Sequence, residues 1–176
     1  MRRRLKENDV VIIQSSESSP SEDHLGMCMT NINGMLRAMH LWFHAAHNTV
    51  YGMPFGGDHF SLYSKIYEEI QEEIDSFIER TVGLTGDQNM ACPIMLTGLA
   101  KDMLKSLPSP TGLKGCEISE AGRDIIEAYL ELLEYAYQKI SQSGDMTLGL
   151  DDLISGSAST HEGYYYLLNQ RATKER

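Results

Sequence analysis

Two histidines and two carboxylates are the residues of this chain whose types and spacing could do chemistry. They are His47 and His59, twelve positions apart, and Asp75 and Glu79, four positions apart. Imidazole and carboxylate groups together are ligands for Fe(II), Mn(II) or Zn(II). Carboxylates four residues apart share one face of a helix, so this pair could act on one ion. Taken alone, the same pair would be read as a solvated acidic face.

The histidines and carboxylates cannot meet at one ion within a single copy of the chain. The segment between His59 and Asp75 reads as one helix, and at about 1.5 Å per residue it would hold them roughly 24 Å apart. A metal ion needs its ligands at about 2 Å. Either the two pairs are unrelated, or a second copy of the chain completes the site across a two-fold axis.

The stretch that holds these residues resembles the Dps-type miniferritins of the ferritin-like superfamily. Its parts are His47-Asn48-Thr49-Val50-Tyr51-Gly52, then His59, then Asp75-Ser76-Phe77-Ile78-Glu79-Arg80. In that family a His opens a polar-Val-x-Gly stretch, a second His follows twelve positions later, and Asp-x-x-x-Glu-Arg closes the second helix. The resemblance implies that the two His of one subunit face the Asp and Glu of its dimer mate, and that these four residues are the metal ligands and catalytic residues.

The activity implied by this resemblance is that of a ferroxidase. Such a protein oxidises Fe(II) with peroxide or oxygen at a one-iron or two-iron site between subunits, with Zn or Mn as substitutes for iron. It stores the ferric product in a hollow cage, here expected to be a dodecamer built from two-fold dimers, and so protects against oxidative damage. The alternative is a structural or DNA-binding cage whose metal site is weak or inactive. A single-chain di-iron oxidoreductase needs two Glu-x-x-His motifs, and the sequence contains none.

The sequence departs from the family pattern at two places. The segment from His59 to Asp75 is one residue longer than usual, which predicts either a π-bulge in the second helix or a His59 that lies just before it. Asn48 stands where a Trp commonly follows the first His. His44 lies on the same helix face as His47, and is a candidate ligand or a group that orients one. Arg80 is expected to form an ion pair with Glu79.

Two further charged groups are candidates for binding ions or nucleic acid. Asp145 and Asp152 lie near the start of the last helix, where acidic residues commonly cap the helix and offset its dipole; the resemblance implies a three-fold pore there that admits cations. The basic residues at the start of the chain could contact DNA phosphates, although a solubilising or cage-docking tail is the plainer interpretation. These residues are Arg2, Arg3, Arg4 and Lys6.

The elements that must position these residues are helices, because apolar residues recur at intervals of three and four. We expect an all-α, ferritin-like four-helix bundle over 23–172, a flexible N-terminal tail over 1–22 and a C-terminal tail over 173–176. The helices are expected at about 23–51, 58–82, 117–142 and 147–172. The second would begin with Asp58 as its N-cap and bury Phe60. The connection over 85–116 would be a long crossover containing a short helix.

Composition narrows the class of protein further. A hydrophobic content of 41% supports a sizeable core, and a net charge of −10 argues against a chain built mainly to coat nucleic acid. The three scattered cysteines have no metal-binding spacing and read as reduced thiols. No apolar run approaches the ~18 residues of a membrane span. The expected location is cytoplasmic, and nucleoid-associated if DNA is bound.

Overall fold

The computed structural model describes residues 23–52 and 54–173. The expected tail of 1–22, with Arg2, Arg3, Arg4 and Lys6, lies outside the described residues, and so do residues 174–176. Within the described ranges every regular element is helical. No helix there is long and apolar enough to cross a membrane.

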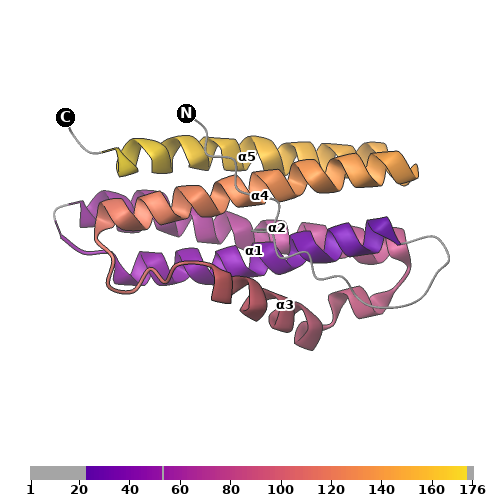
Figure 1. Ribbon diagram of the computed structural model, residues 1–176, viewed down its shortest axis with the longest axis horizontal. Coiled ribbons are helices and arrows are strands. Elements are labelled where there is room, and N and C mark those ends of the chain that lie inside the picture. Colours follow the sequence, from indigo (N-terminus) through magenta and orange to yellow (C-terminus); the bar gives the residue numbers. More distant parts are fainter. Residues whose placement is uncertain (1–22, 53, 174–176) are drawn as a thin grey trace.

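Four long helices run along a common axis (Figure 1). They are α1 (His24–Thr49), α2 (Ser64–Thr85), α4 (Gly115–Ser143) and α5 (Leu148–Ala172). A seven-residue π-helix, η1 (Gly57–Tyr63), leads directly into α2. The crossover between α2 and α4 contains the short 3-10 helix η2 (Gln88–Ala91) and the helix α3 (Pro93–Ser106), which packs against α1. The all-α fold class is therefore confirmed, and each long helix lies within a few residues of its expected range.

The interior of the bundle is built from the apolar stripes of all four long helices. Burying one large apolar side chain contributes about 1.5–3 kcal/mol, so these stripes supply most of the driving force for folding. The largest fully buried members include Phe43, Leu36, Ile66, Phe77, Tyr129 and Ile118.

The start of the second helix differs from the expectation in two respects. Asp58 is not an N-cap: it lies inside η1, where its side chain is buried and bonded to Arg171. Phe60, expected in the core, is 68% exposed. Asp58 is not a cap because the helical segment already begins at Phe55, and the Asp58 amide donates to the Pro54 carbonyl oxygen. The exposure of Phe60 follows from the π-helix, which has more residues per turn than an α-helix and so changes which positions face the core. At the start of α1, Asp23 is the N-cap, since the Gly26 amide donates to Asp23 Oδ1 at 2.8 Å.

Candidate metal centre

His47 and His59 lie face to face at the junction between α1 and η1. Their rings stack with centroids 3.7 Å apart and planes 19° apart. His47 Nδ1 lies 2.9 Å from the carbonyl oxygen of His59, and His59 Nδ1 lies 2.7 Å from the carbonyl oxygen of His47. Each imidazole is therefore anchored to the backbone of the other residue.

These two hydrogen bonds determine which ring nitrogen remains free to bind a metal. A carbonyl oxygen can only accept, so both Nδ1 atoms carry the hydrogen and donate. In the neutral rings of His47 and His59 this leaves the Nε2 lone pairs as ligand atoms. Metal-binding histidines are typically oriented in this way, with the second ring nitrogen donating to a backbone carbonyl.

The extra residue between His59 and Asp75 is absorbed by the π-helix. The amide of Ser64 donates to the carbonyl oxygen of His59, the i to i+5 pattern of a π-turn. The same oxygen accepts from His47 Nδ1, so both of its lone pairs are used. This confirms the first of the two predicted alternatives, because His59 lies within the helix and not before it.

An ion pair next to His59 ties η1 to the far end of the chain. Arg171 Nε donates to both carboxylate oxygens of Asp58, at 2.8 and 3.0 Å, and this bond raises the pKa of the guanidinium. A Cβ on Gly115 would lie 2.6 Å from the Arg171 guanidinium, so glycine leaves the space that the pair needs. Sequence reasoning missed this anchor, because its two members are 113 positions apart.

Aromatic and polar groups surround the histidine pair. Phe55 stacks on His59 at 4.7 Å, and Tyr67 meets His47 edge-on at 5.3 Å. His44 is exposed and lies 6.4 Å from His47 between ring centroids, so it stands beside the pair. Asn48, in place of the family's Trp, donates to the His44 carbonyl oxygen at 2.8 Å.

Asp75 and Glu79 lie exposed on α2 and are not brought to the histidines within one chain. In the described part of the chain, no group of three or more His, Cys, Asp or Glu side chains is placed to hold a metal ion. This agrees with the helix-length argument. The expected ion pair of Arg80 with Glu79 is not formed between these two described residues; the Arg80 guanidinium instead lies so close to Gly149, at the start of α5, that a Cβ there would collide with it.

The acidic residues near the start of α5 do not cap it. Thr147 is the N-cap, and its hydroxyl accepts from the Leu150 amide at 3.1 Å. Asp145 accepts from the Ser143 hydroxyl at 2.7 Å and is exposed, as is Asp152. Their expected role in a pore between subunits involves several copies of the chain and stays a prediction.

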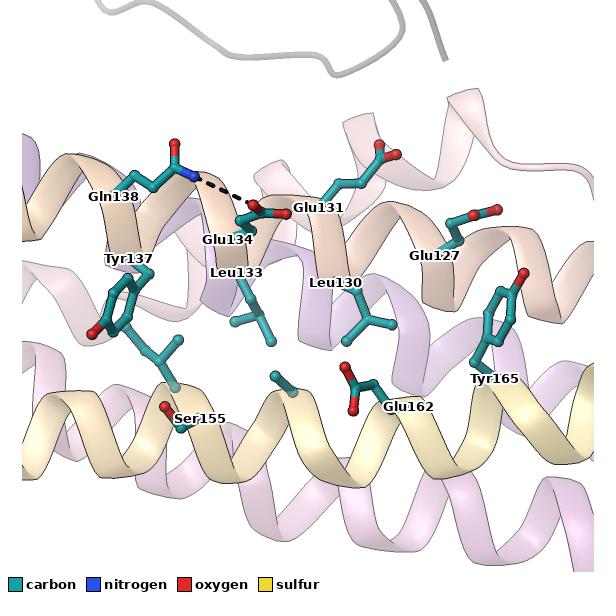
Figure 2. A pocket seen from close by; sticks show the side chains of 12 residues that line it. Glu127, Leu130, Glu131, Leu133, Glu134, Tyr137, Gln138, Ser155, Glu162 and Tyr165 are labelled. Atoms are coloured by element: carbon teal, nitrogen blue, oxygen red, sulfur yellow. Dashed lines mark hydrogen bonds between the residues drawn. The ribbon is translucent and has the colours of Figure 1, made fainter. Parts of the chain in front are cut away.

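A broad groove between α4 and α5 is a further candidate region (Figure 2). Its volume is about 920 Å³. Glu127, Glu131 and Glu134 line it from α4, and Glu162 rises into it from α5. Burial and the neighbouring carboxylates raise the pKa of Glu131. The groove has no imidazole, so the histidine pair is the better candidate for a metal centre.

Comparison with known proteins supports the fold more than the chemistry. No protein-family profile and no curated protein sequence matches this chain. Among solved structures it is similar to Dps from Thermosynechococcus elongatus, at 21% identity and a TM-score of 0.66 over 86% of this chain and 91% of that one. It is also similar to Mycobacterium smegmatis Dps, at 17% identity and a TM-score of 0.69 over 89% and 93% of the two chains.

A third similar structure is Dps from Vibrio cholerae, described as a member of a broad superfamily of ferritin-like diiron-carboxylate proteins. The identity is 17% and the TM-score 0.63, over 88% of this chain and 98% of that one. The class of protein is thereby defined: this chain has a ferritin-like fold. More particularly, its fold is that of the Dps proteins.

Proposed function

We propose that this chain is the subunit of a Dps-type miniferritin, which binds and oxidises Fe(II) between subunits and stores ferric iron in a hollow cage. The observation that carries the proposal is the reciprocal anchoring of His47 and His59. It leaves the Nε2 atoms of the two stacked rings free as ligands, and the bonds to backbone carbonyls determine the tautomer of each ring.

The second half of the site is assigned to the partner subunit. Asp75 and Glu79 share one exposed helix face, and a two-fold axis can bring that face of one copy to the histidines of another. The assembled donor set of imidazoles and carboxylates suits Fe(II). Zn or Mn would bind as substitutes.

Iron enters this reaction as the substrate. Each peroxide molecule takes one electron from each of two ferrous ions and, with two protons, leaves as two water molecules. The protein contributes coordination, an open position for the oxidant and a route for the product. Oxygen is the alternative oxidant. The cage is expected to be a dodecamer of two-fold dimers, with Asp152 and Asp145 at a cation pore, in the cytoplasm.

The experiment is anaerobic loading with Fe(II) followed by addition of peroxide. Ferric absorbance is compared between wild-type protein and Asp75→Ala/Glu79→Ala, after native mass spectrometry shows that both are intact assemblies. Wild-type protein should oxidise and load iron, while the double variant should only match buffer. A wild-type rate no faster than buffer would sink the catalytic proposal.

In that event the chain is better treated as a structural or DNA-binding cage. The basic residues that would contact DNA are Arg2, Arg3, Arg4 and Lys6. That function predicts salt-dependent DNA retention, lost when residues 1–8 are deleted.

A further inference from the structure

A second histidine site lies inside the bundle, between α2 and α5, away from His47 and His59. His161 is fully buried, and its Nε2 lies 3.6 Å from Glu73 Oε2. Tyr129 closes the inner side of this site: its ring meets His161 edge-on at 4.6 Å, and its hydroxyl contacts Glu73 Oε1 at 3.5 Å. The polar contacts of His161 appear only in the fold.

The imidazole of His161 presents an unused lone pair. Its Nδ1 lies 3.0 Å from the carbonyl oxygen of Ser157, which can only accept, so Nδ1 carries the hydrogen. Nε2 is buried and has no hydrogen-bond partner. Buried polar atoms are nearly always satisfied, and leaving one unpaired costs about 1–3 kcal/mol. The arrangement therefore lacks a partner for this nitrogen.

Glu73 is the nearest group, but it does not supply that partner. At 3.6 Å the contact is too long for a hydrogen bond. Nor is it an ion pair, because burial lowers the pKa of His161 to about 4 and leaves its imidazole uncharged near neutral pH. The separation instead fits two ligands of one ion, since atoms about 2.1 Å from a tetrahedral metal lie about 3.4 Å apart.

The outer side of this pair opens to a cleft of about 490 Å³. Glu69 lies on this cleft one helical turn before Glu73, and it accepts a hydrogen bond from the Tyr164 hydroxyl. Glu72 and Asp152 line the same cleft and are exposed. A cation thus has an acidic approach. The bond that His161 donates to the Ser157 carbonyl orients the imidazole, and the Tyr129 hydroxyl lies against the Glu73 carboxylate.

We propose that His161 and Glu73 bind one divalent transition-metal ion within each subunit. Glu69 would be the third ligand; among the described residues these three side chains are not yet grouped around one point, because Glu69 is bonded to Tyr164 and must first be released. The donor set of one imidazole and two carboxylates suits Zn(II), Fe(II) or Co(II). This site needs no partner subunit and no Glu-x-x-His motif. It is independent of the proposed ferroxidase site.

The test uses the full chain carrying His47→Ala/His59→Ala together with Asp75→Ala/Glu79→Ala, so that neither half of the proposed ferroxidase site is left to bind metal. The metal-free assembly is titrated with Co(II), followed by visible absorbance, and with Zn(II), followed by calorimetry. One ion per subunit should bind, and Co(II) should develop the strong bands of a tetrahedral site. Adding Glu73→Gln or His161→Phe should weaken binding by more than about tenfold, the loss that even outer partners of metal ligands cause.

Glu72→Gln is the matched control, because it removes an exposed carboxylate of the same cleft. It should leave the stoichiometry and the Co(II) spectrum unchanged. Native mass and helical circular dichroism check each variant. If His161→Phe does not assemble, Glu73→Gln decides, since it keeps the size of the side chain. Unchanged binding in Glu73→Gln, or a Co(II) spectrum of the hydrated ion throughout, would overturn the proposal.

Discussion

His47 and His59 hold each other in place: the Nδ1 of each ring donates to the backbone carbonyl of the other residue, at 2.9 and 2.7 Å. The end of α1 and the π-helix η1 are thereby locked together by the same groups that we assign to metal binding. The same two hydrogen bonds therefore orient the proposed ligands and join the two elements.

This mutual anchoring predicts energetic coupling between the two histidines. Each single change, His47→Ala or His59→Ala, removes one side-chain hydrogen bond and should cost about 0.5–1.5 kcal/mol. Because the rings also stack at 3.7 Å, the two effects should differ from additivity by more than about 0.5 kcal/mol. The measurement is a double-mutant cycle by urea unfolding in the presence of a chelator.

His40 and His44 provide the matched control cycle. Their rings are also stacked, but the centroids are 6.3 Å apart. Their substitutions should therefore show a smaller departure from additivity than those of His47 and His59. Equal coupling in both cycles would contradict the special status of the His47–His59 pair.

A site shared between subunits predicts complementation in mixed assemblies. One variant carries His47→Ala/His59→Ala and the other carries Asp75→Ala/Glu79→Ala. Neither should oxidise iron alone, whereas a mixed two-fold dimer regains one complete site from the intact halves of its two subunits. Ferric absorbance of co-expressed, doubly tagged assemblies measures this recovery. The contrary result is a mixed assembly that stays inactive although its intact His47–His59 pair and its intact Asp75–Glu79 pair each bind metal. That result would argue against an inter-subunit site.

Much of the fold could be predicted from sequence, because apolar spacing alone locates helices that bury one stripe. The surplus residue between His59 and Asp75, counted against the family pattern, predicted either a π-bulge or a His59 before the helix, and the structure has the π-helix. What could not be predicted depends on long-range partners. Asp58 looks like a helix cap until Arg171 is seen beside it, and the surroundings of His161 come from three different helices. Local patterns carry no information about such contacts.

The Asp58–Arg171 pair should be a major anchor of η1. The Asp58 side chain is 5% exposed, so Asp58→Ala removes charge-assisted bonds from a buried setting and should cost about 2–4 kcal/mol. It should also slow iron oxidation, since His59 is the next residue. Urea unfolding and the peroxide assay measure the two effects.

Arg123 and Asp124 offer the matched control for that substitution. Their contact is 2.6 Å, but the Asp124 side chain is 58% exposed. Asp124→Ala should cost less than about 1 kcal/mol, the usual contribution of a surface pair, and should leave iron oxidation unchanged. A comparable loss of stability in both variants would show that burial of Asp58 is not the cause.

The thiol of Cys28 should resist modification in the folded protein. Burial raises the pKa of this thiol from 9.0 to about 11. At pH 8 its thiolate fraction is therefore roughly hundredfold lower than that of an exposed cysteine, and the thiolate is the reactive form. Raising the pH from 8 to 10 should increase its labelling by a maleimide or iodoacetamide probe, and unfolding in urea should increase it far more. Peptide mass mapping follows Cys28, with Cys28→Ser as the blank. Rapid labelling of Cys28 at pH 8 without urea would mean that the packing around the first turns of α1 opens readily.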